Sequence, residues 1–133
     1  MKRPIRFLRW ALLAVLATSA PACLAAAAAV GAGGAIAWTQ RGASSAVPGS
    51  VDQVYQRTEA VFREMGITQT GQSSADQGAE RSLKGTREDM EVTVEIERES
   101  ASTAQVEVYA RRNTVEFDRN YARDVLTRIV NRS

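Results

Sequence analysis

The one cysteine of this 133-residue chain, Cys23, stands where an export signal would end. The first nine residues carry four cations and no acid, and residues 10–20 follow as an uncharged stretch rich in Leu and Ala. This is the order of the n-region and h-region of a secretory signal. Ala20-Pro21-Ala22 satisfies the small-x-small rule of cleavage, and the cut would leave the Cys23 thiol at the new N-terminus.

A thiol at the first mature position is the residue that bacterial lipoproteins acylate, and an acyl chain anchors a protein to a membrane. We therefore expect a signal peptide at 1–22, cleavage between Ala22 and Cys23, and a fatty acid such as palmitate on Cys23. The folded part of the chain would then be exported and held at the cell envelope.

An uncleaved membrane helix with Cys23 buried inside it is the alternative anchor. No charge occurs between Arg9 and Arg41, and Trp10 and Trp38 bracket this apolar span as interfacial tryptophans do. As a helix rising ~1.5 Å per residue the span would measure ~42 Å, close to a bilayer with its headgroups at ~40–45 Å. Both anchors place the basic N-terminus inside the cell and the domain outside.

Between the signal and the domain lie two segments without an evident core. Residues 23–38 combine the cysteine with an uncharged run of Ala and Gly, which we expect to lie beside the membrane or to act as a flexible tether. Residues 39–49 are small and polar, and they predict a linker with a short edge strand at 45–47. The folded domain is predicted at 50–133.

Charge and composition exclude several classes of function. The chain is +2 overall, but four of its 17 cations lie in the signal, so residues 24–133 hold 13 basic and 15 acidic residues and come to −2. This part lacks the basic surface that nucleic-acid binding requires. The chain has no histidine, which removes imidazole catalysis and His-ligated metals. With no serine in a Gly-x-Ser-x-Gly motif either, we predict no enzyme activity, no cofactor and no metal site.

A helix is predicted to open the domain. Ser50-Val51-Asp52-Gln53 has the form of a capping box, in which the Ser50 hydroxyl and the Gln53 amide each bind a backbone N–H at the helix start. Gly66 supplies the stop, as a glycine just past the last turn does. Residues at helical spacing form the expected buried stripe: Val51, Val54, Thr58, Val61, Phe62 and Met65.

Strands are predicted next, at 67–70, at 79–87 and most clearly at 90–99 and 104–110, with a polar loop at 71–78 and a hairpin at 100–102. Val and Ile alternate with polar residues in the last two strands, as in half-buried strands. The outward glutamates Glu91, Glu95, Glu97 and Glu99 could gather Ca²⁺, but a solvated face is the preferred interpretation. Since opposed like charges destabilise a sheet, we expect Glu95 to pair near Gln105 and Val94 near Val106.

A second amphipathic helix is predicted at the C-terminus. Asp118 is its expected N-cap, and Tyr121, Ala122, Val125, Leu126, Ile129 and Val130 form its apolar face. The order of helix, strands and helix predicts an α+β fold: two layers, an antiparallel β-meander of three to four strands with two helices packed on one face.

These features together resemble an uncharacterised family of small bacterial envelope lipoproteins, the domain of unknown function 3568. The resemblance depends on Cys23, the apolar run at 24–37, the helix from Ser50 to Gly66-Ile67, the alternating strand at 92–96 and the helix at 121–130. It implies export and an acylated Cys23, and it brings no catalytic residues. In a host with two membranes, Leu24 after the cysteine resembles the signal for sorting to the outer membrane, facing the periplasm.

Two functional hypotheses follow. In the first, the chain is a non-enzymatic structural or interaction lipoprotein whose open sheet face or Arg119/Arg123 helix surface docks an envelope protein. In the second, it is a membrane-anchored module that binds anionic lipid or cell-wall glycan through Arg111, Arg112, Arg119 and Arg123. Acidic neighbours interleave with these arginines, so ordinary surface ion pairs are the competing interpretation.

Overall fold

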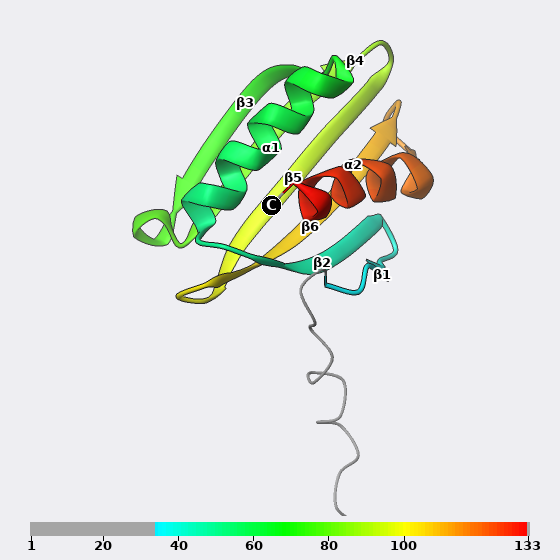
Figure 1. The fold of residues 1–133 in the computed structure, drawn as a ribbon. Coiled ribbons are helices and arrows are strands. Elements are labelled where there is room, and N and C mark those ends of the chain that lie inside the picture. The colour runs from blue at the N-terminus through cyan, green and yellow to red at the C-terminus, as the bar shows by residue number, and fades with distance from the viewer. Residues whose placement is uncertain (1–33, 133) are drawn as a thin grey trace, which may run out of the picture.

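The computed structural model describes residues 34–132, which form a seven-stranded sheet and two α-helices (Figure 1). Along the chain these elements, with one short 3₁₀ turn, are β1 (Ala37–Trp38), β2 (Gly42–Pro48), α1 (Val51–Met65), β3 (Thr68–Ala75), η1 (Asp76–Gly78), β4 (Glu80–Arg87), β5 (Met90–Ser100), β6 (Thr103–Arg112), β7 (Glu116–Phe117) and α2 (Arg119–Asn131). None of the helices in this part of the chain is long and apolar enough to cross a membrane.

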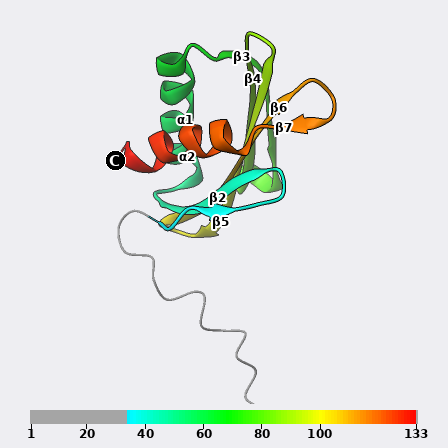
Figure 2. The same ribbon diagram turned by 90° about the vertical axis from the view of Figure 1, so that its right-hand side faces the viewer.

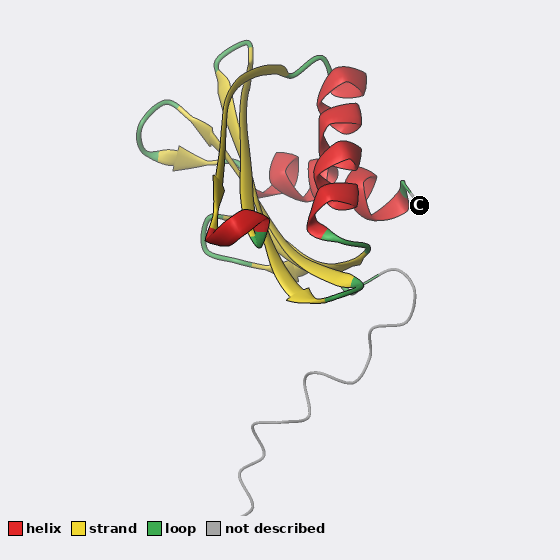
Figure 3. Ribbon diagram, turned by 90° about the vertical axis from the view of Figure 1, so that its left-hand side faces the viewer, coloured by secondary structure: helices red, strands yellow, loops and turns green. Residues whose placement is uncertain are grey.

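The sheet is antiparallel throughout, in the order β1-β2-β6-β5-β4-β3, with β7 pairing the far end of β6. Strands β3 to β6 form a meander, and β2 joins the other side of β6. Both helices cover the same face, which leaves the opposite face open (Figure 3). The α+β class and the antiparallel sheet are confirmed, but the prediction of three to four strands was too low.

The predicted helix ends are confirmed. The Ser50 hydroxyl accepts from the Gln53 N–H at 3.3 Å, while the Gln53 amide oxygen accepts from the Ser50 N–H at 3.0 Å. Gly66 ends α1 in the left-handed conformation, at φ 68°. Asp118 caps α2 by accepting from the Tyr121 N–H at 2.9 Å. Because these caps depend on residues within three positions of each helix end, local sequence was sufficient to place them.

The core lies between the helices and the covered face of the sheet. All six residues of the predicted α1 stripe are buried, as are the alternating apolar residues of β5 and β6. Four residues of α2 complete it: Ala122, Val125, Leu126 and Ile129. At Gly85 of β4 an added Cβ would stand 2.5 Å from Ile67 and 2.9 Å from Phe62, so the close approach of α1 to the sheet requires glycine there.

The segment at 39–49, predicted as a linker with a short strand at 45–47, is mostly the strand β2, which contains that short strand and is longer than predicted. Ala43, Ser45 and Val47 are buried beneath α2, and the intervening residues face outward. The strand was hard to predict because its residues are small and give a weak alternating pattern. They are small because the tight contact with α2 has room for Ala, Ser and Val but for few larger side chains. The folded domain therefore begins before Ser50.

The predicted polar loop at 71–78 is also mostly strand. β3 runs to Ala75 as the edge strand of the meander, and nearly all its residues are exposed. An edge strand exposed on both faces needs no alternation of apolar residues, since its backbone bonds to β4 are what hold it in place. The periodicity on which strand prediction depends is therefore missing here.

The predicted register of β5 and β6 was wrong by two residues. Val94 lies opposite Val108, and Glu95 lies opposite Glu107 rather than near Gln105. The hairpin is tighter than expected, with Ser100 paired to Thr103 and a bulge between Arg98 and Ser100. A shift of two residues keeps every side chain on its face, so the core does not oppose it.

Candidate functional site

Four glutamates gather on the open face of the sheet, and we call them the acidic face: Glu80, Glu95, Glu97 and Glu107. They come from β4, β5 and β6. Glu80 is paired directly with Glu97 across one strand boundary, and Glu95 with Glu107 across the next. Directly opposed like charges destabilise a sheet, so this placement is not one that folding favours.

The second glutamate pair has two compensating neighbours. The Tyr109 hydroxyl donates to Glu95 Oε1 at 2.8 Å, and Arg41 Nη2 lies 3.6 Å from Glu107 Oε1. The Arg41 guanidinium also lies 4.5 Å from the centre of the Tyr109 ring. Partial burial raises the pKa of the Tyr109 phenol, and its bond to the Glu95 carboxylate adds to this, so Tyr109 stays a neutral donor.

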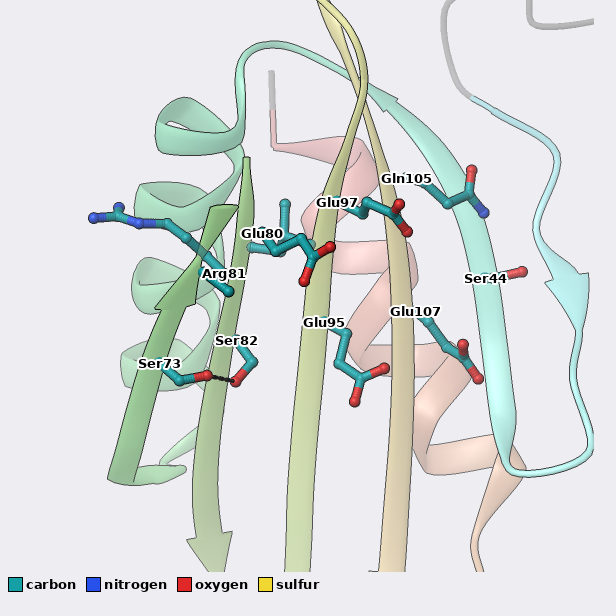
Figure 4. A pocket seen from close by; sticks show the side chains of 11 residues that line it. Ser44, Ser73, Glu80, Arg81, Ser82, Glu95, Glu97, Gln105 and Glu107 are labelled. Carbon is teal, nitrogen blue, oxygen red and sulfur yellow. Dashed lines mark hydrogen bonds between the residues drawn. The ribbon is translucent and has the colours of Figure 1, made fainter. Parts of the chain in front are cut away.

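These glutamates surround a shallow hollow of about 480 Å³ (Figure 4). Ser44 of β2 and Gln105 of β6 lie on one side, while Ser73 and Ser82 close the other with a 2.8 Å hydrogen bond. Arg81 also borders the hollow, but its side chain points away from the carboxylates and pairs with Asp52 of α1 at 2.9 Å. The hollow therefore offers acceptors and negative charge, which suit cationic groups.

No group of three or more carboxylate, histidine or cysteine side chains within residues 34–132 is arranged to hold a metal ion. The glutamates of the open face therefore do not form a metal cage in this structure, although they lie close in sequence. Their chemistry is that of a negatively charged surface.

A family model described as "Protein of unknown function (DUF3568)" matches residues 6–130. The chain belongs to the DUF3568 family. The match includes both the stretch around Cys23 and the folded domain, so the predicted membership in DUF3568 is confirmed. No curated protein and no solved structure shows significant similarity to the chain.

Within this DUF3568 domain, the four arginines predicted as one surface differ in their ion pairing, although Arg112 and Arg119 line the same hollow. Arg111 binds Glu91 at 2.9 Å, and Arg112 lies 3.7 Å from Asp89. Both are therefore surface ion pairs of the kind that contributes little free energy.

Arg119 and Arg123 behave differently, since neither forms an ion pair within residues 34–132. Their guanidinium carbons lie 5.5 and 5.3 Å from the centre of the Trp38 ring, within reach of a cation–π interaction. Trp38 of β1 and Phe117 of β7 line a common hollow with Arg119. We call Trp38, Phe117, Arg119 and Arg123 the Trp38 surface.

The predicted cleavage site between Ala22 and Cys23, the acylation of Cys23 and the signal at 1–22 lie outside the described residues. Sequence reasoning missed the opposed pair of Glu95 and Glu107, because it expected repulsion to set the register. It also missed the contact of Arg119 with Trp38, whose residues are far apart in the chain. The sequence did single out Trp38, as an interfacial residue at the end of an apolar span, but not as a partner of the arginines.

Proposed function

We propose that the chain is a non-enzymatic envelope lipoprotein, anchored through Cys23, whose exported domain is an interaction module. Its acidic face receives a positively charged segment of an envelope protein. The observation that carries the proposal is the opposition of Glu80 to Glu97 and of Glu95 to Glu107 on the uncovered side of the sheet.

Charge pairing elsewhere in the domain supports this interpretation. Glu64 accepts from both Arg128 and Arg132, at 2.8 and 2.6 Å, and Asp52 pairs with Arg81. Glu80 and Glu97, in contrast, have no ion-pair partner within the described part of the chain. Carboxylates that gain nothing from the fold are available for a cationic partner, whose arrival would relieve their repulsion.

The shape of the face supports a protein partner. The hollow is wide and shallow, it spans β4, β5 and β6, and its rim of Ser and Gln side chains offers both donors and acceptors. Such a surface suits an extended or helical segment lying across the strands.

Site-specific crosslinking in intact cells tests the partner. A photoreactive residue at Ser82, on the acidic face, should capture a discrete envelope protein, whereas the same residue at Gln56, exposed on α1, should not. Glu80→Gln with Glu97→Gln should abolish the capture. Glu88→Gln with Glu99→Gln makes the same charge change at exposed positions outside the hollow and should leave it intact. Equal capture from Ser82 and Gln56 would count against the proposal.

Intact-mass measurement of the protein from membranes tests the anchor. The lipoprotein proposal requires loss of residues 1–22 and addition of acyl mass, both absent in a Cys23→Ala variant. A chain that starts at Met1 without acyl mass favours the uncleaved helix.

A further inference from the structure

Three large apolar side chains stay exposed in residues 34–132, and all three lie at one end of the domain. Trp38 is 48% exposed, Val115 84% and Phe117 37%. They belong to β1 and to the hairpin from β6 to β7. Figure 2 looks onto this end, where the turn from β1 to β2, the start of α2 and that hairpin all face the viewer. The other large apolar residues in this part of the chain are buried or partly buried.

Two arginines without an ion-pair partner among the described residues lie beside Trp38. Arg119 and Arg123 project from successive turns of α2 onto the Trp38 ring, beside the positive pole of the helix. Of the acids nearby, Asp118 is engaged as the N-cap, Asp124 lies 3.7 Å from Arg128 and Asp89 lies 3.7 Å from Arg112.

Glu116 is the remaining acid in the hollow of the Trp38 surface. Glu116 and the capping carboxylate of Asp118 balance Arg119 and Arg123 in formal charge, and the N-terminal pole of α2 adds partial positive charge at this end. Exposed aromatic side chains next to unpaired arginines are the combination found at membrane interfaces, where rings insert at headgroup depth and cations meet lipid phosphates.

We infer that the Trp38 surface, with Val115 at the neighbouring hairpin, docks the domain onto the anionic headgroup layer of the membrane that holds the chain. This inference rests on the anchoring part of the proposed function and adds an orientation to it. The uncharged segment at 24–37 runs directly into Trp38. The proposed anchor at Cys23 lies 15 residues before Trp38, a chain that spans at most ~50 Å when extended, so the anchor keeps this surface near the bilayer.

Docking at this end leaves the acidic face available. The Trp38 surface lies at the end where β6 finishes and α2 begins, whereas the glutamates lie along the open face, nearer the start of β6. Anionic lipids repel those glutamates, so the charge distribution of the domain favours this one orientation. A docked domain would present its acidic face to partners beside the membrane.

Tryptophan fluorescence of the full chain tests the inference. Trp10→Phe leaves Trp38 as the one tryptophan, whether or not the signal is removed. The chain is reconstituted into vesicles of phosphatidylcholine and phosphatidylglycerol in equal parts, or of phosphatidylcholine alone, with acyl chains brominated near the headgroup. We expect quenching and a blue shift of Trp38 in the anionic vesicles that weaken at high salt.

Matched variants distinguish an effect of the Trp38 surface from an effect of the total charge of the domain. Arg119→Gln with Arg123→Gln should lower the ratio of docked to undocked domain about 30-fold. Arg63→Gln with Arg98→Gln removes the same charge at exposed positions elsewhere and should leave the quenching unchanged. Val115→Ser, at a side chain that packs against little, should lower the quenching without affecting folding.

Several results would overturn the docking inference: equal quenching in neutral vesicles, equal loss in both arginine pairs, or a Trp38 signal that responds to isolated cell-wall glycan and not to anionic lipid. Vesicle flotation measures membrane anchoring independently of the docking of the domain. Chains that float with an unquenched Trp38 refute docking alone, whereas chains that do not float refute the proposed anchoring.

Discussion

The acidic face and the Trp38 surface differ in how they hold charge that has no ion-pair partner. On the acidic face, like charges oppose one another across strand boundaries and are relieved only in part by Tyr109 and Arg41. On the Trp38 surface, two cations lie against an aromatic ring. Elsewhere the domain pairs several of its charges, as Glu64 does with Arg128 and Arg132. Isolated charges such as Arg63 and Arg98 also have no ion-pair partner within the described residues. What distinguishes the two surfaces is the direct opposition of carboxylates on one and the exposed aromatic ring on the other, and this is the basis on which we propose them as binding surfaces.

If both surfaces are peripheral to folding, the core beneath them should respond far more strongly to substitution. Leu83 of β4 is fully buried between Ser82 and Lys84, which face outward. Leu83→Ala should lower the free energy of unfolding by about 2–5 kcal/mol, through lost burial and the cavity left behind. Denaturant unfolding measures this, and Leu83→Ile, which keeps the volume, should cost less than about 1.5 kcal/mol. An equal effect at Glu97→Gln would break the distinction between core and surface.

Removing a carboxylate from an ion pair should lower the free energy of unfolding, whereas removing one from the acidic face should raise it. Glu64→Gln removes the shared acceptor of Arg128 and Arg132, which links the end of α1 to the end of α2. The three side chains are nearly half exposed, so we expect a loss of only about 1 kcal/mol, weaker at high salt. Glu59→Gln on α1 serves as the charge control in the same unfolding experiment.

Substitution on the acidic face sharpens the same comparison. Glu80→Gln removes one member of the opposed pair with Glu97 and should raise stability by about 0.2–1 kcal/mol at low salt. Glu99→Gln, further along β5, should change it less. If Glu80→Gln instead destabilises the domain at low salt, these carboxylates are structural and the argument for a binding face fails.

The smallest expected effect is a loss of stability at alkaline pH that depends on Tyr109. Burial, and then the bond to Glu95, raises the pKa of the Tyr109 phenol, so the folded state favours the neutral phenol. The stability that depends on this neutral form is fully present below the ordinary tyrosine pKa of 10.0 and is lost as the pH rises through the folded value. The thermal midpoint should therefore fall above pH 10, and Tyr109→Phe should reduce that fall. An identical pH profile for the variant would show that other groups dominate.

Much of the fold was predictable because its signals are local. The capping box at Ser50, the stop at Gly66 and the Asp118 cap act within a few residues, and the alternation in β5 and β6 follows from one face being buried. Family membership was equally accessible, since the pattern of segments runs along nearly the whole chain. The strands β2 and β3 were predicted only in part, at 45–47 and 67–70, because one is built of small residues and the other lies exposed at an edge.

The sequence alone determined which residues form the helices, which faces they bury and that the domain is α+β. Only the tertiary structure decided the register that opposes Glu95 to Glu107, and only it brought Arg119 and Arg123 onto Trp38. The physical reason is the same for both. A shift of two residues in strand register leaves the buried pattern unchanged, so the pattern cannot choose between the two registers. Trp38 lies some 80 residues from the arginines, and no local periodicity relates residues so far apart, so long-range packing determines both features.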